Sequence, residues 1–415
     1  MMTLSPKRAR FALLALALGG FSIGSTEFVA MGLLPEIARD LLPGLSASNP
    51  DAAIGRAGWL ITAYAIGVVV GAPTIAAAAA RFPRKAVLVG LGVAFTAGSL
   101  ASALAPTFHL VVAARFAAGL PHGAYFGVAA LVAAELLGPK KRGQAVAYVL
   151  VGLTIASVVG VPLITYLGQH TGWRAAYLVV AVLFALTTFA LLAFIPAHPG
   201  NPAATIRREL TAFTRPAVWA ALLTGALGFG GFFAVYSYVS PLATEVTGTS
   251  SAFVPIVLMV LGLGTTAGIL GGGRLTDHMG SVRAIFILFG ALAVSLLVLG
   301  LAAHSVAGLL VGVFLVGASA QGLAPAIQTR LMDVAGDSQT LAAAVNHSAL
   351  NIGNSLGALL GGMVIAAGYG YLAPTWIGLM LVVPGVIFAL AGWSLTRRPA
   401  TRVLEAVERR ERRGP

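Results

Sequence analysis

Two charged residues stand inside long apolar stretches of the 415-residue sequence, Glu27 and Arg115. Glu27 is the one acidic residue well inside such a stretch, and Arg115 is the one basic residue. A charge in an apolar environment is costly, so such residues tend to mark functional sites. A carboxyl group can take up and release a proton, and a nearby positive charge stabilises its ionised form. The two residues predict a proton-coupling site, with a purely structural ion pair as the alternative.

Neutral polar and aromatic side chains recur at helical spacing in other apolar stretches. They offer aromatic faces and uncharged donors and acceptors, which suit a neutral or weakly polar small molecule better than a multiply charged one. Packing of the aromatic residues and simple hydrogen bonding of the histidines are the alternatives. The predicted substrate-binding residues are His122, Phe126, Phe233, Tyr236, His347 and Asn351.

Several classes of chemistry are excluded by the sequence. There is no cysteine, so disulfides, thiolate metal sites and iron–sulfur ligation are absent. The sequence has no phosphate-binding loop of the form G-x-x-x-x-G-K-[ST] and no H-E-x-x-H, so ATP-driven transport by this chain and zinc proteolysis are excluded. No apolar stretch carries paired aspartates. We therefore predict no enzyme activity, no metal and no cofactor.

The elements that position these residues follow from composition. Hydrophobic residues make up 58% of the chain and charged residues 9%, against about 25% charged residues in a typical soluble domain. The mean hydropathy is +0.92. A spanning helix needs roughly 20 apolar residues. Twelve stretches satisfy this requirement: 11–34, 58–80, 86–105, 108–136, 143–168, 174–195, 217–243, 252–275, 283–303, 306–330, 340–367 and 373–395.

The positions of the basic residues predict the orientation. If the N-terminus is cytoplasmic, 22 of the 26 lysines and arginines fall on the cytoplasmic side, and only Arg39, Arg56 and Arg174 fall outside. This bias follows the positive-inside rule, so both termini are predicted to be cytoplasmic. The formal charge of +13 is dispersed over many loops and predicts contact with the lipid bilayer rather than with nucleic acid.

A polar, proline-containing segment divides the chain near its midpoint. We predict an N-terminal six-helix half over 1–196, a linker over 197–216, a C-terminal six-helix half over 217–396 and a basic tail over 397–415. A shift of 197 residues lays Gly160 on Gly357 and the segment AAAAARFPRK of the first half on GRLTDHMG of the second. Duplicated six-helix halves are a known transporter architecture.

The pattern G-x-L-x-D-x-x-G at 273–280 resembles the cytoplasmic loop signature of the major facilitator superfamily. The segments TEFVAMGLLPEIA, RFAAGLPHGAYFG, GLTIASVVGVPL and NHSALNIGNSLGALLGG look like its twelve-helix drug:proton antiporters, above all the sugar efflux permeases and chloramphenicol exporters. The first half departs from the pattern, with Ala80 at the acidic position and Pro83 at the glycine. The resemblance implies a conformational role for Arg81, Arg84, Gly273, Asp277, Gly280, Gly160 and Pro162.

The sequence and the resemblance together predict an all-α integral membrane protein with twelve transmembrane helices in two six-helix pseudo-repeats around a central cavity. It is expected in the bacterial inner membrane as a monomer, with a small-molecule substrate and protons as partners. The predicted function is proton-coupled antiport that exports a drug or a sugar. The alternatives are a symporter or uniporter that imports a sugar-like solute, and a membrane receptor that does not transport.

Overall fold

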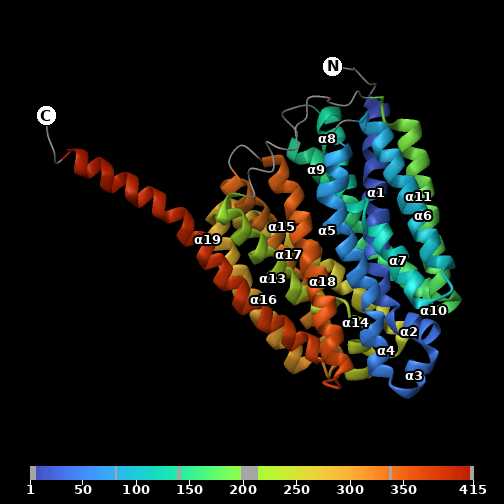
Figure 1. Ribbon diagram of the computed structural model, residues 1–415. Coiled ribbons are helices and arrows are strands. Elements are labelled where there is room, and N and C mark those ends of the chain that lie inside the picture. The colour runs from blue at the N-terminus through green and yellow to red at the C-terminus, as the bar shows by residue number, and fades with distance from the viewer. Residues whose placement is uncertain (1–5, 80–81, 138–141, 198–213, 336–338, 412–415) are drawn as a thin grey trace.

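The computed structural model describes residues 6–79, 82–137, 142–197, 214–335 and 339–411. These residues form helices and connecting turns, with no β-strand among them (Figure 1). The all-α fold and the twelve predicted spans are confirmed. The spans are Lys7–Gly32, Pro50–Ile75, Arg84–Leu104, Phe108–Leu137, Tyr148–Thr171, Trp173–Phe194, Pro216–Ser237, Ser251–Met279, Ser281–Ala302, Val306–Ala335, Asn346–Ala366 and Ala373–Thr396.

Six spans precede the predicted linker and six follow it. The linker falls almost entirely on 198–213, outside the described residues. The first half contains α1 (Pro6–Gly32), α2 (Leu34–Leu41), α3 (Pro43–Ser48), α4 (Pro50–Ala57), α5 (Trp59–Ala79), α6 (Arg84–Leu104), α7 (Phe108–Gly119), α8 (His122–Leu137), α9 (Arg142–Ile155), η2 (Ala156–Gly160), α10 (Val161–Thr171) and α11 (Trp173–Phe194). The second contains α13 (Pro216–Tyr236), α14 (Val239–Pro241), η4 (Leu242–Val246), η5 (Ser251–Phe253), α15 (Val254–Met279), α16 (Ser281–Ala302), α17 (Val306–Ala335), α18 (Gln339–Ala366) and α19 (Ala373–Glu411).

The two halves repeat one packing scheme. In the first half α1 packs on α9, α5 on α7, and α6 on α11; in the second, α13 packs on α18, α15 on α17, and α16 on α19. Gly160 and Gly357 occupy equivalent places. A Cβ atom at Gly160 would meet the Phe21 ring on α1, and one at Gly357 would lie 2.5 Å from the Ala234 nitrogen on α13. The internal repeat predicted from the sequence is therefore present in three dimensions.

The connection between α15 and α16 is shorter than the sequence predicts. Residues Gly273 to Met279, expected in a loop, form the last turns of α15, and Gly280 ends the helix with φ +79°. Only glycine adopts this backbone conformation readily, which explains the residue type at this position. Asp277 consequently lies on the exposed end of a helix, and it has no ion-pair partner among the described residues.

Both halves fasten the third helix to the fourth at the same end of the bundle. In the first half Arg84, the first residue of α6, forms an ion pair with Glu135 on α8. In the second, Ser281, the first residue of α16, donates a hydrogen bond of 3.0 Å to Asp333 on α17. The shift that relates Gly160 to Gly357 also relates Arg84 to Ser281. The contact between the third and fourth spans thus occupies the same position in both halves. It is an ion pair in the first half and a hydrogen bond from a neutral hydroxyl group in the second.

Three spans are interrupted near proline. The fourth breaks at Leu120 and Pro121, between α7 and α8. The fifth passes through the π-helical segment η2, after which Pro162 lies in the first turn of α10. Proline lacks the backbone N–H and clashes with the preceding turn, so a span that contains it bends or changes helix type. The seventh ends at Ser237, ahead of α14 and Pro241.

Three short helices, α2 to α4, lie at the end of the bundle opposite the N-terminus (Figure 1), where α2 and α3 link the first and second spans and α4 begins the second. Asp40 on α2 fastens them to α11, because it accepts a hydrogen bond of 2.9 Å from the Trp173 indole and pairs with Arg174. Burial acts to raise the pKa of Asp40, but the hydrogen bonds from Arg174 and Trp173 outweigh it and hold the pKa below its usual value.

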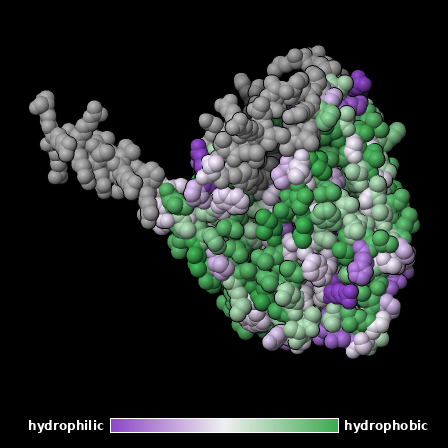
Figure 2. All heavy atoms as spheres, in the orientation of Figure 1, coloured by the Kyte–Doolittle hydropathy of each residue, from purple (hydrophilic) through white to green (hydrophobic). Residues whose placement is uncertain are grey.

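The spans differ in how much of their surface other helices cover. Of the most apolar window in each, 83% is buried in Pro216–Ser237 and 78% in Lys7–Gly32, but only 33% in Ala373–Thr396. Helices α1 and α13 therefore lie at the centre of the bundle, and α19 lies at its edge. Figure 2 shows apolar residues over much of the side of the helix bundle that it presents. Large apolar side chains on the surface of the bundle, such as Leu301 and Phe189, are more than two thirds exposed, as expected for contact with lipid.

Candidate functional site

Glu27 lies five residues before Gly32, the last residue of α1, and is 5% exposed. Its Oε1 accepts a hydrogen bond of 3.3 Å from the Asn354 side-chain amide on α18. α1 belongs to the first half and α18 to the second, so this bond joins the two halves. The Glu27 carboxyl group is thus buried at the seam between the halves.

Arg115 is fully buried on α7, at the level of Glu27. Its Nη1 donates a hydrogen bond of 3.2 Å to the Thr26 hydroxyl, one residue before Glu27. The guanidinium carbon lies 4.2 Å from the Tyr64 ring centroid and 5.5 Å from that of Tyr177. Stacking on aromatic faces stabilises a desolvated guanidinium group. The hydrogen bond to Thr26 therefore places Arg115 at the level of Glu27.

Glu27 and Arg115 do not form a direct ion pair. Among the described residues, the ion pairs within 4.0 Å join Arg84 to Glu135 and Arg174 to Asp40. The buried Nε and Nη2 of Arg115 have no hydrogen-bond partner in the described part of the chain. The guanidinium group thus has donors that are free to bind a further acceptor. The simple structural ion pair, the alternative considered from the sequence, does not describe this arrangement.

His122, at the start of α8, contacts Arg115's aromatic neighbour. Its Nδ1 shares a hydrogen bond of 3.0 Å with the Tyr64 hydroxyl. One turn further, the Phe126 ring stacks on the His347 ring of α18, with centroids 5.1 Å apart and an interplanar angle of 4°. This stack is a second contact between the halves, and it brings together three residues predicted to bind substrate.

The aromatic stripe on α13 faces the same region. Phe28, next to Glu27, stacks on Tyr236 with centroids 5.1 Å apart and lies 6.5 Å from Phe233. The Tyr236 hydroxyl is buried and has no hydrogen-bond partner among the described residues. The α13 stripe, for which packing was the alternative, therefore packs and also presents an unpaired polar atom.

Asn351 lies one turn from His347 on α18, and its amide donates a hydrogen bond of 3.0 Å to the His347 carbonyl. Its Oδ1 is buried and has no partner within the described ranges, and the same holds for the Oδ1 of Asn354. Buried polar atoms are almost always hydrogen-bonded in proteins. The unpaired buried atoms that gather here belong to Arg115, Tyr177, Tyr236, Asn351 and Asn354. Such a set of donors and acceptors fits a site that binds a polar ligand or water.

Three aromatic residues at this site were absent from the sequence prediction: Phe28, Tyr64 and Tyr177. A tyrosine in mid-span needs a partner for its hydroxyl, and this signal could have pointed to Tyr64 and Tyr177. Phe28 carried no signal of its own, because apolar aromatic residues are common in spans.

Most of the described residues predicted to act in conformational change lie at helix ends away from this site. Arg81 is outside the described residues, and Arg84 pairs with Glu135. Gly273, Asp277 and Gly280 lie at the end of α15, as described above. Gly160 ends η2 and Pro162 follows it, close to the seam between the halves, where Ser157 of η2 contacts Gly262 of α15.

The halves are closed against each other at the end of the bundle that carries α2 to α4. The Tyr371 hydroxyl donates a hydrogen bond of 2.6 Å to Asp51, and Gln169 donates one of 3.0 Å to the Ser251 carbonyl. Burial raises the pKa of Tyr371, and its hydrogen bond to Asp51 adds to the rise, so its hydroxyl stays protonated as the donor. Gly55 of α4 is so close to α18 that a Cβ would lie 2.5 Å from the Gly362 carbonyl oxygen. We call these contacts the outer seam.

Among the described residues, no cluster of three or more His, Asp or Glu side chains is arranged to hold a metal ion. The site therefore consists of one carboxyl group, one guanidinium group, two imidazoles and a set of amides and phenols. These groups can exchange protons and bind small organic molecules through hydrogen bonds and ring stacking.

Twelve membrane-spanning helices in two repeated halves, with a buried polar site where the halves meet, define a membrane transporter. A family model described as Major Facilitator Superfamily matches residues 16–308 and 248–414, and the chain belongs to that superfamily. It is thus a multi-pass inner-membrane transporter and not an enzyme. Members of this superfamily bind small-molecule substrates and usually work as monomers.

Two relatives and one solved structure illustrate the likeness. The chain is 37% identical over 396 residues to the inner membrane transport protein YdhP of Escherichia coli K12, covering 95% of this chain and 98% of the relative. It is 34% identical over 378 residues to a chloramphenicol resistance protein of Streptomyces lividans, covering 90% and 94%. The structure of a D-xylose-proton symporter superposes with a TM-score of 0.74 at 19% identity, covering 93% and 97%.

Proposed function

We propose that the protein is a proton-coupled antiporter that exports a small neutral or weakly polar organic molecule. The observation that carries the proposal is Glu27, a buried carboxyl group that reaches across the seam to Asn354. An ionised carboxylate accepts this hydrogen bond strongly, whereas a protonated one accepts it weakly. Proton uptake at Glu27 therefore loosens one of the contacts between the halves.

The proposed cycle uses this link in both directions. Glu27 takes a proton while the site is open to the outside, which favours release of the substrate there. When the site opens inward, Arg115 stabilises the ionised carboxylate, and the proton leaves as new substrate binds. The outer seam is closed in this structure, so the conformation belongs to the part of the cycle in which the site is shut off from the outside.

The residues that contact the substrate are proposed to be His122, Phe126, Phe233, Tyr236, His347 and Asn351. Phe126 and His347 now stack on each other across the seam, so a bound molecule would separate the rings and stack between them. A substrate with several negative charges would need more basic residues than Arg115, and a polycation would need clustered acids. A drug-like or sugar-like molecule meets neither requirement.

The direction of transport is supported by likeness rather than by geometry. The similarity to the chloramphenicol resistance protein of Streptomyces lividans supports export of a drug-like molecule by this chain. The same fold also serves a D-xylose-proton symporter, so proton-coupled import is the competing function. A transport-inactive receptor would bind ligand without moving it.

Counterflow in proteoliposomes tests these three functions. With a pH gradient that is acidic on the outer side, the antiporter expels labelled chloramphenicol or sugar and acidifies the lumen. A symporter accumulates the substrate under the same gradient, and a receptor gives no flux in either condition. Loss of binding in any of Phe233→Ala, Tyr236→Ala or Asn351→Ala supports this pocket. Unchanged affinity in all three variants would place the substrate elsewhere.

The topology completes the proposal. The N-terminal half over 1–196 and the C-terminal half over 217–396 are proposed to move as two bodies joined by the linker. Both termini face the cytoplasm, and the outer seam then faces away from it.

A further inference from the structure

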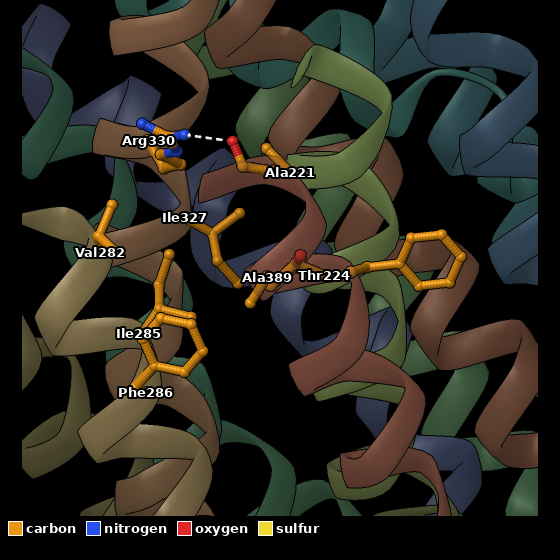
Figure 3. Close-up of a pocket in the computed structure, with 10 residues that line it drawn as sticks. Ala221, Thr224, Val282, Ile285, Phe286, Ile327, Arg330 and Ala389 are labelled. Carbon is orange, nitrogen blue, oxygen red and sulfur yellow. Dashed lines mark hydrogen bonds between the residues drawn. The ribbon is translucent and has the colours of Figure 1, made fainter. Parts of the chain in front are cut away.

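A cavity lies in the C-terminal half, away from the seam between the halves. It spans about 320 Å³, including space that is open to the surroundings, between α13, α16, α17 and α19 (Figure 3). The lining contains none of the residues assigned to protons or substrate. It consists of Ala221, Thr224, Val282, Ile285, Phe286, Ile327, Arg330, Phe388, Ala389 and Gly392.

The cavity faces the lipid rather than the centre of the molecule. α16 and α19 form its outer rim, and α19 is the least covered span of the bundle. Phe286 and Phe388 in the lining are half-buried, and their neighbours Ile287 and Ile387 are 46% and 57% exposed. A groove that opens between spans at this edge contacts acyl chains and not water.

One end of the cavity lies near the inner ends of its helices. Arg330 is five residues before Ala335, where α17 ends, which corresponds to about 8 Å along the helix. Val282 is the second residue of α16, and its neighbour Arg283 is exposed. Headgroup phosphates and the first carbons of acyl chains occupy this depth in a bilayer. The positive-inside orientation makes this the cytoplasmic leaflet.

Arg330 is the one ionisable residue in the lining, and its guanidinium group is only partly satisfied. Its Nη2 donates hydrogen bonds of 2.9 Å to the Gly392 carbonyl and of 2.9 Å to the Thr396 hydroxyl. A guanidinium group has five N–H donors, so further donors remain. Asp333 is one turn away and interacts with Arg330 through its charge, but it lies beyond 4.0 Å from Arg330 and accepts a hydrogen bond from Ser281. Arg330 therefore has no direct anionic partner among the described residues.

A second arginine reinforces the positive charge at this end. Arg215, at the start of α13, donates a hydrogen bond of 3.2 Å to the Val334 carbonyl on α17. Arg215, Arg283 and Arg330 thus stand on three of the four helices around the cavity. Basic pockets between spans on the cytoplasmic side are suited to anionic lipid headgroups.

We infer that this groove binds an anionic phospholipid of the cytoplasmic leaflet, with its phosphate at Arg330 and one acyl chain against Ile285, Phe286 and Ile327. The apolar lining argues for a lipid, because a soluble anion uses the arginines alone. The inference does not depend on the proposed transport function, since it concerns a separate surface and is tested by binding.

Native mass spectrometry of the purified full chain tests the inference. The protein is mixed with phosphatidylglycerol or with phosphatidylcholine of the same acyl chains. We expect retention of phosphatidylglycerol, and Arg330→Gln is expected to weaken it about tenfold, which is the scale of a lost charge-assisted hydrogen bond. Arg274→Gln is the matched control. It removes the same charge from the exposed inner end of α15, away from the cavity, and should leave retention unchanged.

A second variant separates the acyl groove from the charge. Ala389→Phe fills the half-buried floor of the groove and leaves Arg330 in place, and it should also reduce retention of phosphatidylglycerol. Melting of each variant in detergent checks that it is folded. Equal retention of the two lipids, or equal losses in Arg330→Gln and Arg274→Gln, would overturn the inference. So would displacement of the lipid by millimolar inorganic phosphate, because the site would then be one for free anions.

Discussion

At the scale of residues, the site combines one carboxyl group with one guanidinium group that share a level of the bundle without pairing. Glu27 reaches to Asn354 in the opposite half, while Arg115 lies against Tyr64 and Tyr177 in its own half. The positive charge is held in place by rings and by Thr26. In the proposed cycle the carboxyl group is the member of the pair that changes partners.

Glu27→Gln tests the coupling role directly. Glutamine preserves the size of the side chain and its contact with Asn354, but it cannot carry a proton. We expect the variant to be made in normal amounts and to bind substrate, while a pH gradient no longer drives substrate against its concentration. Transport assays in proteoliposomes with an imposed gradient measure this effect. Uphill transport at the wild-type rate would contradict the role of Glu27.

Arg115→Ala should shift the pH dependence of transport. Without the nearby positive charge, the ionised form of Glu27 is less stable, so the proton leaves only at higher pH. We expect the pH of half-maximal transport to rise by about one unit, equivalent to about 1.4 kcal/mol. Arg115→Lys keeps the charge and is the control, with a smaller shift expected. An unchanged profile in an active Arg115→Ala protein would remove Arg115 from the coupling.

At the scale of elements, close approach at glycine shapes the outer seam. Gly55 of α4 lies against Gly362 of α18, and Gly58 lies against the Tyr238 hydroxyl. Small residues let helix backbones come together in a membrane, where no hydrophobic effect drives helices together. Tyr238 also donates a hydrogen bond of 2.5 Å to the Ala358 carbonyl, so its hydroxyl is held at the seam. These contacts leave no room for a larger residue.

Gly55→Val should open the outer side. The added carbons collide with the Gly362 carbonyl only when the seam is closed, and overpacking of this kind costs about 1–3 kcal/mol. We expect the closed conformation to lose population about tenfold. Since the chain has no cysteine, Ser237→Cys introduces a unique, buried probe whose rate of maleimide labelling should rise accordingly. Gly44→Val, where a Cβ has open space, is the control. Equal labelling of both variants would show that the seam tolerates bulk.

How much the sequence could predict depended on the element. The number of spans was predictable because length and hydropathy suffice. The stack of Phe126 on His347 was not, since it depends on how the two halves are placed relative to each other. The rotation of α13 was equally hidden, because it is apolar around most of its circumference and therefore shows no one-sided pattern. Glu27 and Arg115 were predictable because a charge is conspicuous in an apolar span.

One element was wrong in the prediction for a local reason. The charged residues of 273–279 suggested a loop, whereas α15 continues through them to Gly280. A helix that leaves the membrane keeps its backbone hydrogen bonds, so polar residues mark the surface of the bilayer and not the end of the helix. The same reason explains why α19 runs to Glu411, into the segment expected to be a tail.

At the scale of the whole molecule, the fold is two repeated halves whose helices α1 and α13 lie at the centre. The basic residues are distributed unevenly between the two ends of this bundle, and that distribution predicts its orientation. The uneven distribution of basic residues and the repeated helix packing therefore determine different properties of the molecule. The repeat determines which helices meet, and the arginines and lysines determine which end faces the cytoplasm.

The orientation is tested with two single-cysteine variants in intact cells. Ser48→Cys, on α3 beside the outer seam, should react with a membrane-impermeant maleimide in intact cells whose outer layers admit the reagent. Met279→Cys, at the exposed inner end of α15, should react only after the membrane is permeabilised. The cysteine-free parent gives the background. The reverse pattern would invert the proposed topology.

The glycine contacts of the outer seam also limit which mutations the gene can tolerate at these positions. Any single-base change in a glycine codon that yields another amino acid adds at least one carbon atom to the residue. At Gly55 and Gly362 that carbon has nowhere to go when the halves close, whereas at the open Gly44 it does. In a randomly mutagenised population, lost activity without lost protein should therefore concentrate at seam codons, and a compensating change should arise on the facing helix of the other half.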